Sequence, residues 1–188
     1  MVRGISDDCS CSAACEDLNH LFRRCPVAVK VNVDGSRRCD SGAITAGGVA
    51  RNSEKVWLAG FVVEKGVGSA LCAELWAILE GLKLAWSLGC RRVIVETNSM
   101  EAVECFNPSV MDNHPLWNII HTCRRLIKRD WLCHITHVFR ERNNVVNGLA
   151  QMGQVIEENY SGFSSPPAAV LKNVMSDLCG SVMARMSS

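Results

Sequence analysis

The stretch VAVKVNVDG at residues 27–35 alternates between valine and other residues and ends on Asp34 and Gly35. Side chains alternate between the two faces of an extended chain, so the four valines share one face. Lys30, Asn32 and Asp34 share the other face. The pattern predicts a β-strand that buries its valine face and ends at Gly35, with the carboxylate of Asp34 directly before this end.

Two further strands follow this one. The segments AITAGGVARN at 43–52 and KVWLAGFVVEKG at 55–66 are apolar and are separated only by a short turn. Links this short predict an antiparallel meander of three strands. Gly47 and Gly48 stand inside the second strand, which predicts a bulge or a close approach of another backbone.

The hydrophobic period changes beyond the third strand. Apolar residues recur at helical spacing through 69–89, and Gly89 is a suitable helix stop. The run RRVIVET at 91–97 is rich in β-branched residues and predicts a buried strand. The later elements are a short helix at 99–106, a helix at 115–130, a strand at 131–141 and a helix at 143–153.

This order predicts an α/β fold, with a five-stranded mixed sheet flanked by helices. Residues 154–188 contain SSPP and weak periodicity, so we expect a C-terminal tail with one loose helix at 168–179. The sequence thus divides into a Cys-rich segment at 1–26, a domain at 27–153 and the tail.

Composition sets broad limits on function. The chain has 188 residues, of which 48% are hydrophobic and 21% charged, with a formal net charge of +1. A near-neutral total neither supports nor excludes a nucleic-acid partner, because binding depends on local patches. The sequence has no apolar run of membrane-spanning length and no secretion signal, so we expect the protein to stay inside the cell, nuclear or cytoplasmic, with no membrane partner. We also expect it to be a monomer. Most of the eleven cysteines are expected to be reduced and packed.

Five polar residues lie where a structural role does not fully account for them. Asp34 ends the first strand, and Glu74 borders the apolar stripe of the long helix. Asn98 follows a buried strand, His137 lies late in the last strand, and Asn147 lies early in the last helix. Each has an ordinary alternative, such as a turn residue, an edge glutamate, a helix cap or a surface side chain.

Taken together, four blocks resemble the type 1 ribonuclease H domain. They are VKVNVDGS at 29–36, AELWAILEGLKLAWSLG at 73–89, RRVIVETNS at 91–99 and HVFRERNNVVNGLAQMG at 137–153. The resemblance is strongest to the domain carried by plant non-LTR retroelements and their domesticated relatives, and it covers about residues 27–153. It implies hydrolysis of the RNA strand of an RNA–DNA hybrid, with two Mg²⁺ ions held by four carboxylates.

The resemblance places Asp34 and Glu74 on two of those carboxylates and His137 on the family histidine. The other two carboxylate positions are occupied by Asn98 and Asn147. An amide keeps the shape and one carbonyl oxygen of a carboxylate but loses its charge. Because two nearby cations repel each other, half the negative charge is expected to hold at most one Mg²⁺ weakly. We therefore expect cleavage to be slower by several orders of magnitude, or absent.

Three functions remain open from the sequence. The first is a nucleic-acid-binding domain with little or no turnover. The second is a non-catalytic folded relic or a protein-interaction module. The third is an active nuclease in which Glu96 completes the metal site. It is less favoured because the family has a glutamate at this position in addition to its aspartate, so this glutamate does not replace the aspartate.

Positive charge near the predicted site could contact nucleic-acid phosphates. The alternative is a solvated helix face, and nearby acids weaken the patch. The candidates are Lys83 on the long helix, Arg124, Arg125, Lys128 and Arg129 on the 115–130 helix, and Arg140 and Arg142 near the predicted site.

The segment 1–26 resembles the end of a zinc-binding segment that precedes this domain in the same retroelements. The resemblance assigns Zn²⁺ ligation to Cys9, Cys11, His20 and Cys25, although Cys9 and Cys11 are separated by one residue instead of two. A tetrahedral Zn²⁺ needs four well-placed ligands. The alternative is a truncated relic without metal.

Overall fold

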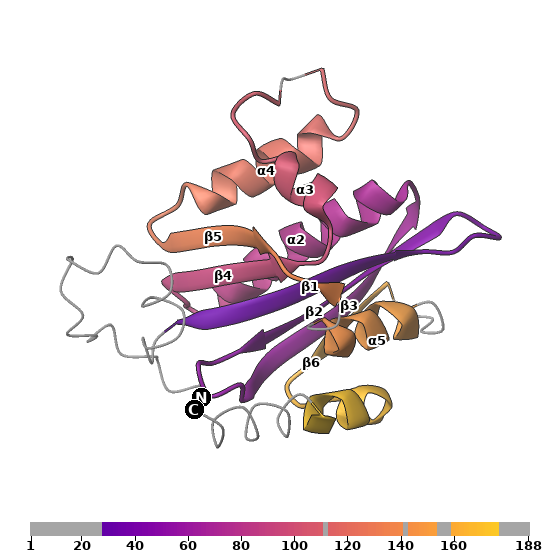
Figure 1. Cartoon of the computed structure of the whole chain (residues 1–188), viewed down its shortest axis with the longest axis vertical. Helices are drawn as coiled ribbons and strands as arrows, with labels where there is room; N and C mark the ends of the chain where they lie inside the picture. Colours follow the sequence, from indigo (N-terminus) through magenta and orange to yellow (C-terminus); the bar gives the residue numbers. More distant parts are fainter. Residues whose placement is uncertain (1–27, 111–112, 141–142, 154–158, 177–188) are drawn as a thin grey trace.

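The computed structural model describes residues 28–110, 113–140, 143–153 and 159–176. Within this part, six strands form one mixed sheet in the order β5-β4-β1-β2-β3-β6 (Figure 1). β1, β4 and β5 are mutually parallel, and the remaining pairs are antiparallel. The strands are β1 (Val29–Arg37), β2 (Ala43–Arg51), β3 (Trp57–Val67), β4 (Arg92–Thr97), β5 (Leu132–His137) and β6 (Tyr160–Phe163).

The predicted α/β class and mixed sheet are confirmed, but the predicted number of five strands is wrong. The additional strand, β6, lies in the segment expected to be a tail, and it pairs with β3 from Gly60 opposite Phe163 to Val63 opposite Tyr160. Its sequence, YSGF, is an edge strand with no fully buried residue. Such a strand lacks the apolar alternation that identified the others. Beyond it, η2 (Ala168–Val170) and a helical stretch at 171–176 occupy the position of the predicted loose helix.

Helices cover both faces of the sheet (Figure 1). Three helices and the valine face of β1 enclose the larger core, in which Val31, Leu75 and Ile120 are fully buried. The other face carries a second core, in which Val62, Leu149 and Val170 meet. The helices are α2 (Ala70–Ser87), α3 (Met100–Glu104) and α4 (Trp117–Ile127) on the first face and α5 (Asn144–Met152) on the second.

Two glycines bring helices close to the middle of the sheet. A Cβ on Gly35 would lie 2.4 Å from the backbone of Ala73 and Glu74, so only glycine lets α2 approach β1 this closely. A Cβ on Gly47 would lie 2.7 Å from the backbone nitrogen of Ala150 on α5. The close approach predicted at Gly47 and Gly48 is therefore confirmed for Gly47. Gly35 admits α2 on one face of the sheet and Gly47 admits α5 on the other.

The cysteines in the part of the chain that the structure describes form no disulfide with one another. Cys90, Cys105 and Cys123 are buried, as expected for cysteines that act as small apolar residues. Among the same residues, no helix has the length and apolar character needed to span a membrane.

Candidate functional site

The parallel pairing of β1, β4 and β5 ends at one edge of the sheet. β1 itself continues beside β2 to Arg37, so the predicted end of this strand at Gly35 is wrong. In the register of β1 and β4, Val33 lies opposite Thr97, so Asp34 and Asn98 follow at adjacent positions. Thr97 in turn lies opposite His137 at the end of β5. Ligands commonly bind outside the carboxyl ends of parallel strands. The structure thus brings three of the predicted site residues to the same edge.

Glu74 reaches this edge from α2. Its carboxylate accepts a hydrogen bond from the backbone N–H of Gly35 and another, 3.3 Å long, from Oγ1 of Thr97. Gly35 thus allows α2 to approach the strand, and its backbone N–H donates a hydrogen bond to the Glu74 carboxylate of that helix. The two hydrogen bonds hold Glu74 across the ends of β1 and β4, next to Asp34.

Burial makes the charged forms of both acids unfavourable. Desolvation raises the pKa of Asp34 from 3.8 to about 6, although a hydrogen bond from Asn98 and the charge of Arg140 act to lower it. Desolvation, followed by repulsion from Asp34, raises the pKa of Glu74 from 4.5 to about 8. Near neutral pH the pair therefore holds about one proton in the absence of a cation.

The Asn98 side chain has one satisfied and one unsatisfied end. It hydrogen-bonds to Asp34, but its Oδ1 atom is buried and has no hydrogen-bond partner among the described residues. Buried polar atoms are rarely left unpaired, so an unsatisfied oxygen beside two carboxylates fits a hard, oxygen-liganded cation. The described chain nevertheless contains no cluster of three or more His, Cys, Asp or Glu residues able to hold a metal. The candidate ligands for a divalent ion at this edge are thus two carboxylates and one amide oxygen.

The remaining two predicted site residues lie on neighbouring elements. The His137 ring packs edge-on against Phe139, with ring centroids 5.8 Å apart. Asn147 lies on α5, where its Oδ1 atom accepts a 3.3 Å hydrogen bond from Nε2 of Gln151. Within the described residues, no hydrogen bond or ring contact joins His137 or Asn147 to the carboxylate pair, so their predicted roles remain predictions.

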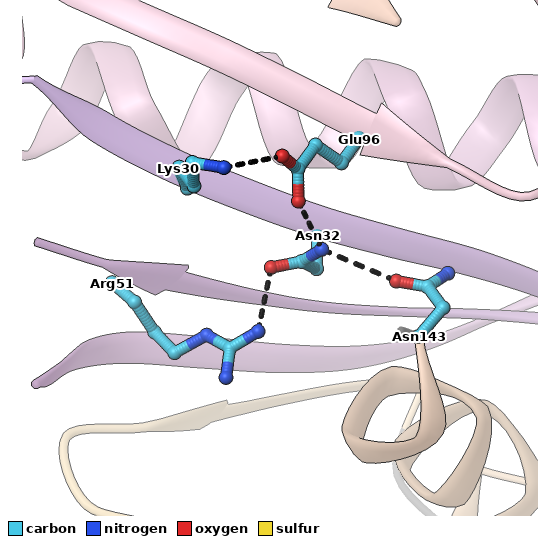
Figure 2. Close-up of polar contacts among 5 residues, drawn as sticks. All are labelled: Lys30, Asn32, Arg51, Glu96 and Asn143. Carbon is cyan, nitrogen blue, oxygen red and sulfur yellow. Dashed lines mark hydrogen bonds and ion pairs between the residues drawn. The ribbon is translucent and has the colours of Figure 1, made fainter. Parts of the chain in front are cut away.

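A buried polar network lies on the face of β1 that carries Asp34 (Figure 2). Asn32 is its centre and is 2% exposed. Its Nδ2 atom donates to Oε2 of Glu96 at 2.8 Å and to Oδ1 of Asn143 at 3.3 Å. Its Oδ1 atom accepts from Nη2 of Arg51 at 2.7 Å, and Glu96 also pairs with Nζ of Lys30 at 2.7 Å.

The network accounts for two features of the site. First, both oxygens of Glu96 already have partners, which argues against Glu96 as a replacement metal ligand. Second, Asn143 also donates from Nδ2 to the carbonyl oxygen of Val33 at 2.9 Å, and it is the N-terminal cap residue of α5. The start of α5 is thereby fixed to the residue that precedes Asp34.

Sequence reasoning did not identify Asn32, Arg51 or Asn143 as partners in one network. The available signal was a polar residue in the middle of a strand, on the same face as Asp34. Its three partners come from β2, β4 and the start of α5, so only the fold brings them together.

Three of the basic side chains predicted to contact nucleic acid interact with other groups of the protein. Nζ of Lys83 lies 3.1 Å from Oε1 of Glu80. Arg124 donates to the carbonyl oxygens of Cys105 and Asn107 and packs over the Trp117 ring. Arg129 packs over the ring of Trp86, 4.6 Å from its centroid.

The other basic candidates differ in position. Arg125 and Lys128 are exposed on α4, and Arg140 is exposed beyond β5, where its charge acts on both Asp34 and Glu74. Arg142 and the proposed zinc ligands Cys9, Cys11, His20 and Cys25 lie outside the described residues.

The fold is shared with solved ribonucleases H. RNase H1 of the archaeon Halobacterium salinarum superposes with a TM-score of 0.63 at 22% identity, covering 68% of this chain and 98% of that one. The RNase H domain of a Mycobacterium tuberculosis protein gives a TM-score of 0.62 at 24% identity, covering 68% and 94%. A third structure, LC11-RNase H1 in complex with an RNA/DNA hybrid, gives 0.59 at 21% identity, covering 66% and 94%. The architecture is thus that of an RNase H-like fold.

Sequence comparison gives the family. Residues 32–153 match the model of the reverse transcriptase-like family, and the chain belongs to that family. An Arabidopsis thaliana protein whose name assigns it to the ribonuclease H proteins is 36% identical over 157 residues, which is 84% of this chain. The match spans 25% of the length of that relative.

Proposed function

We propose that this domain binds RNA–DNA hybrid or a related nucleic acid at the ends of β1 and β4, and that its hydrolytic activity is reduced by several orders of magnitude or lost. The observation that supports this proposal is the set of candidate metal-binding oxygen atoms at this edge of the sheet. Asp34 is buried, Glu74 lies partly buried close enough for their charges to interact, and the third donor is the unsatisfied amide oxygen of Asn98.

A single Mg²⁺ would be held by Asp34, Glu74 and Oδ1 of Asn98. When bound, it would supply positive charge to a phosphate oxygen. The protein's own contribution is to desolvate the two acids and to fix their orientation, Glu74 through Gly35 and Thr97 and Asp34 through Asn98. Hydrolysis in this family depends on two metals, and nothing in the donor set offsets the repulsion of a second cation. The residues therefore favour binding over cleavage.

A second candidate is a non-catalytic fold that acts as a protein-interaction module. The observation that favours it is the engagement of Lys83, Arg124 and Arg129 by partners within the chain, because these charges are then less available to phosphates. The two candidates differ in one measurable property, the salt dependence of binding to nucleic acid.

The test combines binding and cleavage. Affinity for a labelled RNA–DNA hybrid is measured across a salt series, and cleavage is measured with Mg²⁺ or Mn²⁺. The natural chain is compared with Asn98→Asp/Asn147→Asp. We expect salt-sensitive binding by both proteins and cleavage only by the double variant. Absence of hybrid binding would favour the interaction module, and equal cleavage by both proteins would refute the charge argument.

A further inference from the structure

The chain that leaves β5 is fastened beside the site at both of its ends. The backbone N–H of Val138 donates to the carbonyl oxygen of Thr97 at 2.8 Å, directly before Asn98. At the other end, Asn143 donates to the carbonyl oxygen of Val33 through its side chain at 2.9 Å, directly before Asp34. The backbone N–H of Asn143 also donates to the carbonyl oxygen of Arg140 at 2.9 Å. Phe139 and Arg140 are therefore held next to the two strand ends that carry the site.

Phe139 is exposed in this position. It is 72% exposed, and its ring forms a T-shaped pair with the His137 ring, with centroids 5.8 Å apart. An exposed phenylalanine leaves a large apolar ring in contact with water, which is unfavourable. Single exposed apolar residues are common and need no explanation by themselves. The position of this one is informative, because it directly precedes Arg140 and lies two residues after His137, which is opposite Thr97 in the sheet.

That cation is Arg140. Its side chain is exposed, and its charge acts on both Asp34 and Glu74, which places it within electrostatic range of the site. A guanidinium group matches the geometry of a phosphate. Phe139 and Arg140 are consecutive and both exposed, so a nucleotide bound at this edge could meet an aromatic ring and a guanidinium group on neighbouring residues.

We propose that Phe139 is a stacking platform for an unpaired nucleobase whose phosphate is bound by Arg140. Bases inside a duplex are already stacked on each other, so a protein aromatic ring requires a single-stranded nucleotide or a duplex end. This inference rests on the proposed nucleic-acid binding and narrows it. The preferred ligand is an RNA–DNA hybrid with a single-stranded overhang, and a blunt hybrid of the same length binds less tightly.

The experiment uses a hybrid with a fluorescent 2-aminopurine in a short overhang, together with the blunt hybrid. The natural chain should quench the fluorophore and bind the overhang ligand more tightly. Phe139→Ala should abolish the quenching and weaken overhang binding about tenfold, within the range of base–aromatic stacking energies. Phe139→Trp should retain both properties. The matched control is Leu132→Ala, which removes an apolar side chain, 43% exposed, from the opposite end of β5.

The outcomes separate the two proposals. If the natural chain binds both ligands equally and Phe139→Ala changes neither affinity nor fluorescence, stacking is refuted while nucleic-acid binding stands. If the natural chain binds neither ligand at any salt concentration, the proposed function fails and the platform fails with it. A loss of overhang affinity in Leu132→Ala equal to that in Phe139→Ala would also overturn the assignment. Thermal unfolding of each variant checks that the fold is intact.

Discussion

At the scale of single residues, the carboxylate pair makes folding dependent on pH. The folded-state pKa of Glu74 is raised from 4.5 to about 8, so the folded chain binds more protons than the unfolded chain between these values. The free energy of unfolding should therefore fall as pH rises from about 4.5 to 8 without a divalent cation, and Asp34 adds to this between 3.8 and about 6. Glu74→Gln should lose most of this slope and gain roughly a few kcal/mol of stability relative to the natural chain at pH 8. Urea unfolding of both proteins at several pH values checks this, and parallel pH profiles would contradict it.

The same pair predicts how a divalent cation affects stability. A cation competes with the proton on Glu74, so its affinity should rise with pH. We expect Mg²⁺ or Mn²⁺ to raise the unfolding temperature more at pH 8 than at pH 6. Asn98→Asp should enlarge the shift because it adds a negative charge, and Asp34→Asn should remove it. Differential scanning fluorimetry with and without metal measures the effect, and an undiminished shift in Asp34→Asn would place the cation elsewhere.

At the scale of secondary-structure elements, Asn143 joins α5 to the sheet. It is 1% exposed and bonds to the carbonyl oxygen of Val33 and to Asn32. Asn143→Ala leaves these buried groups without partners and should lower the free energy of unfolding by about 1–3 kcal/mol. Hydrogen exchange should quicken first in α5, because its start is no longer held. Gln151→Ala, which changes an exposed residue of the same helix, is the control. Uniform quickening across all helices would indicate general destabilisation instead.

The elements were predictable from the sequence where the signal was local. The alternating valines of β1 and the helical spacing of α2 depend only on which face is buried, so their positions were found to within a few residues. The pairing of Asp34 with Glu74 came from a family resemblance, and the physical reason for it lies in Gly35, which admits α2 to the strand end. The partners of Asn32 could not be predicted, because they come from three elements far apart in the chain.

At the scale of the whole molecule, the fold extends beyond the segment that the family model matches. The match ends at residue 153, yet β6 continues the sheet at the edge of β3. Beyond β6, Val170 is fully buried and Val174 is 8% exposed in the second core, where they pack with α5. The C-terminal segment therefore completes the cover over α5, the helix that carries Asn147.

Removal of this segment should weaken the second core while leaving the first intact. A chain ending at Gly153 loses the burial of two valines, about 1.5–3 kcal/mol each, and exposes the edge of β3. We expect its free energy of unfolding to fall by a few kcal/mol and its tendency to aggregate to rise. A chain ending at Ser176 retains every described residue and is the matched control, while Val170→Ala tests the core contact alone. If the chain ending at Gly153 matched that control in urea unfolding and in α5 exchange, the segment would be dispensable. Asn147 would then be positioned by Asn143 and the sheet alone.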